Sequence, residues 1–448
     1  GSRPRTATPI QSTIVRLRGE RLTSTGVPAR ESGPANAAQI SPPLNSQAIL
    51  AEPNPGLMQT ISYTWASVFA ARAKGTNLVD FETFEHLNFR LPGPTPLPPQ
   101  VREALSGPAI HHRGPLLKSI MARVLERLQA AHRTTSPVLL WPGSGSAGWE
   151  IAITNLLSPG DAVLVTTVGD FGDRFARVSE RLGLEVHRVA KPWGQAVLPE
   201  DLEAALAEVP DCRAVLITHN ETSTGVTNPL ADLAAVARAH DCLTIVDAVS
   251  SAGALPLEMD AWDLDFVLSG SQKAWMCPPG LVFCAIGPRA WEAYEQSGYL
   301  RFFWDMAEMK SFADKHMTPT TPPLNLIFGL DAALELMETE GWDNVWSRHH
   351  LVAETTRQAV TESGLRLFAD PAVASDSLTA IEVPDGFTAS AVVEQVMKEH
   401  NVLLQIGQGA YAEKVIRIGH MGWVSEADVI EATNALADVA AKTGLTAG

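Results

Sequence analysis

Residues 213–251 read RAVLITHNETSTGVTNPLADLAAVARAHDCLTIVDAVSS, and this stretch decides the fold class. Two short runs, AVLIT and LTIV, are apolar apart from one threonine each, and the segment PLADLAAVARAH between them has the spacing of an amphipathic helix. A strand, a helix and a second strand in this order predict two parallel strands, because parallel neighbours need a crossover connection. Continuously apolar strands are typical of a sheet that helices cover on both faces. We therefore expect an α/β fold with a mostly parallel sheet.

The same alternation of helices and strands continues on both sides of this stretch. Apolar runs at 162–167, 265–270 and 281–286 predict further strands, and the segment 115–132 has helical spacing. The Pro-Pro-Gly turn that precedes the run 281–286 would let this last strand run antiparallel to the others. A second set of short runs after residue 325, SLTAIEVP, NVLLQIG and VIRIGH, predicts a smaller α/β unit.

Length and composition divide the chain into three parts. With 448 residues it is long enough for two domains, and we expect a large domain at 81–325 and a small C-terminal domain at 326–448. Residues 1–80 form an N-terminal extension that begins rich in Ser, Thr, Pro and Arg. We expect disorder there, because so little apolar surface cannot offset the entropy cost of ordering. Such an Arg-rich, acid-poor start would also suit import into an organelle.

Charge and cysteine content exclude several classes of protein. A formal net charge of −16 argues against a nucleic-acid partner, whose phosphates this surface would repel. No apolar run reaches the length of about 18 residues that a membrane span needs, so no membrane partner is expected. The cysteines form no Cys-x-x-Cys pair, and we expect reduced thiols in a cytoplasmic protein.

Ligands of doubly wound sheets bind beyond the carboxyl ends of the strands, and two unusual features of this sequence lie at such ends. The bend WPGSGSAGWE brings Ser144, Gly145 and Ser146 to the start of a predicted helix, where close backbone N–H groups favour an anion such as phosphate. A Gly-Ser linker is the alternative there. Asp247 ends the apolar run LTIV, where a carboxylate needs a cation or a protonated ring nitrogen as its partner, unless it only caps the next helix.

Lys273 lies at another strand end, in the stretch LSGSQKAWMCPPG at 268–280. Alone, such a lysine would most simply cap the strand and reach to water. Together with a phosphate-binding bend and a buried carboxylate, its amine suits pyridoxal 5'-phosphate (PLP), which forms a Schiff base with a lysine and needs a protonated ring nitrogen. Arg417, in the apolar run VIRIG, adds a guanidinium that can bind the carboxylate of an amino acid or a 2-oxo acid.

From about Asn88 to Gly444 the chain resembles the serine–glyoxylate and alanine–glyoxylate aminotransferases, which belong to class V of the fold-type I PLP enzymes. The stretches that carry the resemblance are LPGPTPLPPQV, GSGSAGWEIAITNLLSPGDAVLV, HNETSTGVTNPL, IVDAVSS, GSQKAWMCPPGL, GLDAALELMETEG and VIRIGHMG. The resemblance implies a fold-type I PLP transferase. The large domain would bind PLP on a mostly parallel seven-stranded sheet, and a smaller C-terminal α/β domain would follow it.

The resemblance also implies roles for individual residues. Lys273 would form the Schiff base, Asp247 would pair with the pyridine nitrogen, and Arg417 would bind the substrate carboxylate. The remaining residues would hold the cofactor: its phosphate by Ser144, Gly145, Ser146 and Gln272, its two ring faces by Phe171 and Val249, and its ring oxygen by Thr222. No metal ion is implied.

One part of the family pattern is altered in this chain. In the family a Tyr-Thr-Pro segment of the partner subunit completes the phosphate site, which implies a homodimer with shared active sites. Here the segment reads KHMTPTTPPLN and contains no tyrosine. Counting back from GLDAAL favours Thr321 as the phosphate ligand, whereas the local pattern favours Thr318.

The activity that the resemblance implies is PLP-dependent amino transfer. The protein would move an amino group from serine or alanine to glyoxylate or pyruvate, so its substrates would be small amino acids and 2-oxo acids. Two alternatives stay open at this point. One is a class-V lyase or hydrolase that acts on a small amino acid, and the other is a non-catalytic PLP-binding protein.

Overall fold

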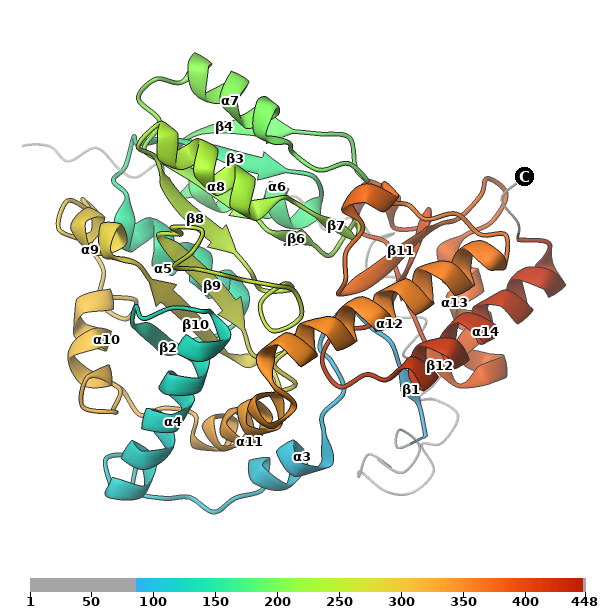
Figure 1. The fold of residues 1–448 in the computed structure, drawn as a ribbon, viewed down its shortest axis with the longest axis horizontal. Coiled ribbons are helices and arrows are strands. Elements are labelled where there is room, and N and C mark those ends of the chain that lie inside the picture. The colour runs from blue at the N-terminus through green and yellow to red at the C-terminus, as the bar shows by residue number, and fades with distance from the viewer. Residues whose placement is uncertain (1–85, 446–448) are drawn as a thin grey trace, which may run out of the picture. The chain divides into compact units, whose positions relative to one another are not determined.

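A seven-stranded sheet lies at the centre of the larger part of the chain, in a computed structural model that describes residues 86–445 (Figure 1). Its strand order is β2-β10-β9-β8-β5-β3-β4, with the bounds β2 (Val138–Gly143), β3 (Ala162–Thr167), β4 (Glu185–Ala190), β5 (Ala214–Thr218), β8 (Leu243–Asp247), β9 (Phe266–Gly270) and β10 (Gly280–Ile286). The strands from β9 to β4 pair in parallel, and β10 pairs antiparallel with both β2 and β9. The prediction of a mostly parallel seven-stranded sheet with one reversed strand is confirmed.

Helices cover both faces of this sheet, and each face has its own apolar core. One core contains buried side chains of α3 (Pro99–Leu105), α4 (Pro115–Ala131), α7 (Pro199–Glu208), α8 (Leu230–Ala239) and α11 (Leu324–Glu340). The other contains those of α5 (Gly145–Leu156), α6 (Asp170–Arg181), α9 (Pro288–Tyr294) and α10 (Met306–Ala313). Within β5, Val215 and Ile217 enter the first core and Leu216 enters the second. Because both faces are covered, the strand is apolar at successive positions.

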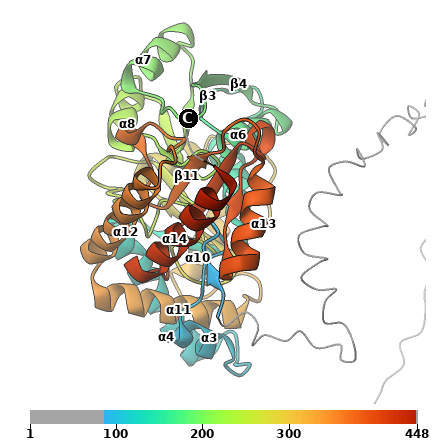
Figure 2. The same cartoon turned by 90° about the vertical axis from the view of Figure 1, so that its right-hand side faces the viewer.

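A second, antiparallel sheet follows, with the strand order β11-β14-β13. Its strands are β11 (Leu378–Glu382), β13 (Gln405–Ile406) and β14 (Val415–Gly419). Three helices, α12 (Trp342–Glu362), α13 (Ala389–His400) and α14 (Glu426–Thr443), lie side by side over it (Figure 2). Next to it β12 (Val402–Leu403) pairs in parallel with β1 (Asn88–Phe89). The turns η1 (Pro371–Val373) and η2 (Gly409–Tyr411) are the remaining short helical elements.

A small hairpin joins the two sheets. Its strands, β6 (Asn220–Glu221) and β7 (Val226–Thr227), pair antiparallel directly after β5. On the side of the second sheet, Val226 forms an antiparallel bridge with Ala374. The hairpin is the stretch HNETSTGV of the sequence, and it forms a structured contact between two parts of the chain.

Other expectations concern the surface and the ends of the chain. None of the helices between residues 86 and 445 has the length and hydropathy to cross a bilayer. All four cysteines are free thiols, and three of them are buried. The expectation of disorder at 1–80 concerns residues outside the described range, and the domain boundary at residue 325 stays a prediction.

Candidate active site

The turns that follow the parallel strands meet at one edge of the large sheet. Lys273 lies in the turn between β9 and β10, Asp247 is the last residue of β8, and the bend at 144–146 joins β2 to α5. The hairpin β6–β7 follows β5, and Phe171 lies in the first turn of α6, after β3. The structure therefore brings the strand-end features of the sequence to the same edge, where ligands of such sheets bind.

The Lys273 side chain is closely packed against the backbone of Pro92 and Gly93. Its Nζ donates a hydrogen bond of 2.5 Å to the carbonyl oxygen of Pro92. A Cβ at Gly93 would lie 2.6 Å from this Nζ, so glycine is what lets the lysine side chain pass. Burial is the largest cause that lowers the pKa of Lys273 to about 8, and the positive charge of Arg417 is the second. The negative charges of Asp247 and Glu221 act in the opposite direction. An amine with this pKa is partly unprotonated near neutral pH and is a better nucleophile than an ordinary lysine.

Asp247 is a buried carboxylate that is held by two donors. The indole Nε1 of Trp149 donates to its Oδ2 at 2.8 Å, and the backbone N–H of Val249 donates to its Oδ1 at 2.9 Å. Burial raises the pKa of the Asp247 carboxyl, and both hydrogen bonds and the charge of Lys273 oppose that rise. A protonated ring nitrogen beside this carboxylate would supply the cation that a buried anion needs.

The bend before α5 is open to a ligand. Ser144 and Ser146 are exposed, while Gly145 between them is buried. A Cβ at Gly145 would lie 2.5 Å from Cγ2 of Val249, so only glycine fits the bend against the residue that follows Asp247. Ser144 occupies the N-cap position of α5, and its side chain accepts no capping hydrogen bond there. The N–H of Ala147 donates to the carbonyl of Ser144, so the N–H groups of Gly145 and Ser146 are the ones that this helix start offers to an anion.

Arg417 reaches the same region from β14 of the second sheet. Its side chain is 3% exposed, and its hydrogen bonds within residues 86–445 go to two backbone carbonyls, those of Ile406 at 2.8 and 2.9 Å and of Thr222 at 2.8 Å. Burial lowers the pKa of Arg417 to about 10, against the charges of Glu221 and Asp170. A buried guanidinium that is bound by carbonyls retains a full positive charge for a substrate carboxylate.

The other residues predicted for the cofactor lie nearby. Phe171 and Val249 are both half-buried at the margin of the core that contains α5 and α6. Thr222 is buried in the hairpin, and Oε1 of Gln272 is buried without a hydrogen-bond partner among residues 86–445. Of the two threonines left open by the sequence, Thr318 is buried and its hydroxyl donates to the carbonyl of Thr320, whereas Thr321 is exposed.

Comparison with known proteins agrees with this geometry. The family model described as "Aminotransferase class-V" matches residues 93–431. The chain belongs to the class-V aminotransferases. An L-aspartate–glyoxylate aminotransferase from Paracoccus denitrificans is 40% identical over 364 residues, which cover 79% of this chain and 91% of that protein. A serine–glyoxylate aminotransferase from Methylorubrum extorquens is 36% identical over 353 residues, with coverage of 76% and 88%. Among solved structures, an alanine–glyoxylate aminotransferase from Nostoc sp. has a TM-score of 0.77 at 30% identity and covers 82% of this chain and 98% of its own.

As a class-V aminotransferase, the protein uses PLP, and the residues at the sheet edge fit this cofactor. The amine of Lys273, the buried carboxylate of Asp247 and the exposed serines of the bend match the aldehyde, the ring nitrogen and the phosphate of PLP in kind. Gln272 would bind a phosphate oxygen through its Nε2–H₂ group, because its Oε1, which has no partner among residues 86–445, can only accept hydrogen bonds.

Three residues of the site were not predicted as functional from the sequence. Trp149 binds Asp247, the carbonyl of Pro92 binds Lys273, and Glu221 lies fully buried in the hairpin. Trp149 and Pro92 belong to stretches that carry the family resemblance, but nothing in the local pattern shows which distant side chain each one contacts. Glu221 is one polar residue among many in HNETSTGV, so its burial could not be seen.

Proposed function

We propose that this class-V aminotransferase moves an amino group from a small amino acid, serine or alanine, to glyoxylate or pyruvate. The observation that carries the proposal is the buried Lys273 amine with its lowered pKa, which lies within electrostatic reach of two buried carboxylates, those of Asp247 and Glu221, and of the buried guanidinium of Arg417. The names of the three relatives support glyoxylate as the acceptor, since all three contain it. Their donors differ, so the donor is the least constrained part of the proposal.

The proposed reaction assigns a role to Lys273, Asp247 and Arg417. PLP, when bound, supplies an aldehyde that takes up the amino group and a ring that accepts the electrons released at the substrate Cα. Lys273 would hold the cofactor through its aldehyde and would move the proton at the substrate Cα. Asp247, held by Trp149, keeps the ring nitrogen protonated. Arg417 binds the α-carboxylate and so orients the Cα–H bond toward Lys273.

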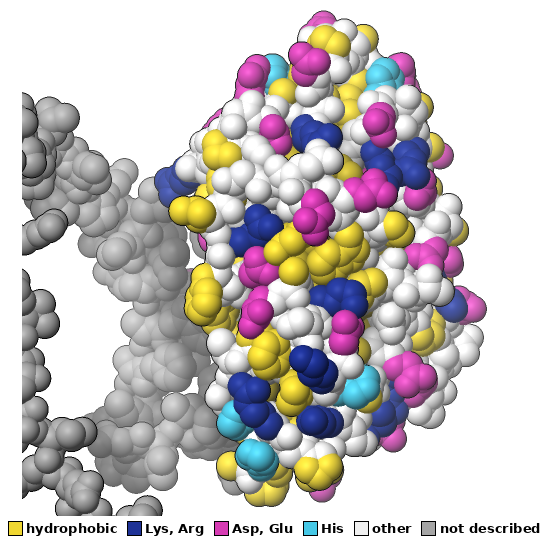
Figure 3. All heavy atoms as spheres, turned by 90° about the vertical axis from the view of Figure 1, so that its left-hand side faces the viewer, with side chains coloured by type: hydrophobic (Ala, Val, Ile, Leu, Met, Phe, Trp, Pro, Cys, Tyr) yellow, Lys and Arg dark blue, Asp and Glu magenta, His cyan; other side chains and the backbone are white. Residues whose placement is uncertain are grey.

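We also propose that the enzyme is a cytoplasmic homodimer with shared active sites. Leu300 and Phe302, between α9 and α10, are 101% and 88% exposed, which is unusual for large apolar side chains. Figure 3 looks onto the side of the molecule where α9 and α10 lie, and hydrophobic side chains gather over the middle of this face. The exposed Thr321 would then reach the phosphate of the partner's site. The four free thiols support a reducing compartment.

The proposal is tested by following the visible absorbance of the PLP-loaded enzyme. Serine or alanine should bleach the band in the absence of any acceptor, and glyoxylate or pyruvate should restore it. Lys273→Ala should abolish turnover, with kcat at least about 10³-fold lower, because the proton at Cα has no other base. Bleaching that no 2-oxo acid reverses would instead indicate a lyase or hydrolase. A band that no amino acid changes would indicate a non-catalytic PLP-binding protein.

A further inference from the structure

The helix that carries Phe171 does not cap its own N-terminus. The N-cap position of α6 is Gly169, which has no side chain to accept the first N–H groups. Residues of the β6–β7 hairpin accept them instead: Asp170 N–H donates to Oγ of Ser223 at 2.9 Å, and Phe171 N–H and Gly172 N–H both donate to Oε2 of Glu221 at 3.0 Å. The start of α6 is therefore capped by a segment about 50 residues further along the chain.

The hairpin and the start of α6 are in direct contact. A Cβ at Gly169 would lie 2.3 Å from Oγ of Ser223 and 2.4 Å from Cγ of Glu221. The Glu221 side chain is 0% exposed, so this contact excludes water. Any movement of Glu221 would move the backbone of Phe171 with it.

All groups that bind the Glu221 carboxylate are donors. Oε2 accepts the two N–H groups of α6, and Oε1 accepts the N–H and O–H of Ser223 at 3.0 and 2.6 Å. Burial raises the pKa of the Glu221 carboxyl, and these four hydrogen bonds oppose the rise. An amide at this position would turn its own NH₂ group toward N–H donors, which leaves buried donors without acceptors.

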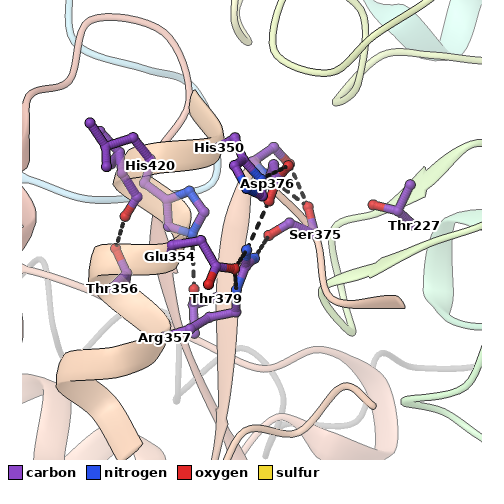
Figure 4. Close-up of polar contacts among 12 residues, drawn as sticks. Thr227, His350, Glu354, Thr356, Arg357, Ser375, Asp376, Thr379 and His420 are labelled. Atoms are coloured by element: carbon purple, nitrogen blue, oxygen red, sulfur yellow. Dashed lines mark hydrogen bonds and ion pairs between the residues drawn. The ribbon is translucent and has the colours of Figure 1, made fainter. Parts of the chain in front are cut away.

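The same hairpin also holds the substrate-binding arginine and the second sheet. The carbonyl of Thr222 accepts the hydrogen bond from Nη1 of Arg417. Asn220 Nδ2 donates to the hydroxyls of Ser250 and Ser377, both at 2.9 Å, and Ser375 N–H donates to the carbonyl of Gly225. Ser375 is in turn bound by Arg357 of α12, and Figure 4 shows it between this helix and Thr227 of the hairpin.

We propose that Glu221 is a positioning residue of the active site. As an ionised carboxylate it fixes the start of α6, and with it the ring of Phe171, against the hairpin that also fixes Arg417. The inference rests on the proposed function for the role of Arg417, and on the family resemblance for the stacking role of Phe171. It adds that one buried charge, which touches neither cofactor nor substrate, aligns the cofactor-stacking ring with the carboxylate-binding arginine.

The test compares Glu221→Gln with a matched variant, Asp265→Asn. Asp265 is also a buried carboxylate, it accepts the N–H of Thr244 at 2.8 Å, and it lies just before β9, at the end of that strand opposite to Lys273. We expect both variants to lower the melting temperature. Only Glu221→Gln should weaken PLP binding, by about tenfold in the dissociation constant, and raise KM for the amino donor.

Hydrogen exchange gives a readout that needs neither cofactor nor turnover. Exchange of a peptide that covers residues 169–175 of the cofactor-free protein should be faster in Glu221→Gln than in the wild type, and unchanged in Asp265→Asn. If Glu221→Gln does not fold, Ser223→Ala serves instead, because it removes both the acceptor for Asp170 N–H and one of the four donors to the Glu221 carboxylate, and leaves the Glu221 bonds to α6 in place. Ser223→Ala should change PLP affinity, KM and hydrogen exchange in the same direction as Glu221→Gln, by smaller amounts.

The outcomes separate this inference from the proposed function. If the wild type shows no amino transfer but Glu221→Gln still weakens PLP binding and speeds exchange at 169–175, the proposed function fails and the positioning role stands. If the wild type transaminates and Glu221→Gln matches Asp265→Asn in PLP affinity, KM and exchange, the positioning role is overturned.

Discussion

Individual residues show how far a sequence can reveal buried charge. Lys273, Asp247 and Arg417 were predicted because each is a charged residue within or beside an apolar run. Burying a charge there costs free energy unless the charge has a partner. Glu221 carries the same kind of charge at full burial, but it lies in a polar stretch, and only the fold shows which member of that stretch is inside. The pattern of residue types pointed to charged side chains that the fold brings to one edge of the sheet, whereas their orientation depends on contacts between distant segments, such as Trp149 with Asp247.

The low pKa of Lys273 predicts how the cofactor-free protein takes up PLP. Below pH about 8 the ammonium form dominates and cannot attack an aldehyde, and above it the amine is free. The uptake rate, followed by stopped-flow absorbance, should rise with pH, reach half of its maximum near pH 8 and level off above that pH. Arg417→Gln removes the second cause of the shift and should move this midpoint upward. A rate that keeps rising toward pH about 10, the range of an ordinary lysine, would contradict the shift.

At the scale of elements, the strands and the glycine bend were predictable and the hairpin was not. Apolar runs bounded by turns define β3, β5, β8, β9 and β10, because strands covered on both faces need no polar alternation. The β6–β7 hairpin has strands of only two residues, and its stability comes from α6, Arg417 and the segment before β11. Contacts with distant segments produce no periodic pattern of apolar residues in the local sequence.

The bend between β2 and α5 should not tolerate a side chain at Gly145. In Gly145→Ala the new Cβ would lie 2.5 Å from Cγ2 and 3.1 Å from Cγ1 of Val249, so the bend or the residue after Asp247 must move. We expect a loss of about 1–3 kcal/mol in the free energy of unfolding and weaker PLP binding. Denaturant unfolding and absorbance titration measure the two effects.

A double variant identifies the cause of that loss. Val249→Ala removes both γ carbons, so Gly145→Ala should cost less in its presence than in the wild type, which is a non-additive effect between residues in contact. Equal costs in the two backgrounds would show that the overlap with Val249 is not responsible.

The whole molecule brings together the two parts of the chain at one site. Arg417 comes from the second sheet, and β1, which precedes the large sheet in the chain, pairs with β12 near the other end. The sequence predicted both sheets, but it could not show this pairing, because two-residue strands carry no period of their own. If a partner subunit covers the exposed apolar face, as proposed, the site would also depend on that subunit.

The proposed homodimer therefore makes a prediction for a residue outside the active site. Phe302→Asp places a charge on the exposed apolar face between α9 and α10, and we expect it to convert the dimer to a monomer in light scattering and to weaken PLP binding, since Thr321 of a partner would no longer reach the phosphate. Leu351→Asp is the control, because Leu351 is a half-exposed leucine on α12 and should leave both properties unchanged. If the wild type is already monomeric at the concentrations of the assay and still binds PLP fully, each site is complete within one chain, and the shared site is excluded. If Phe302→Asp remains dimeric, the partner covers another face of the molecule.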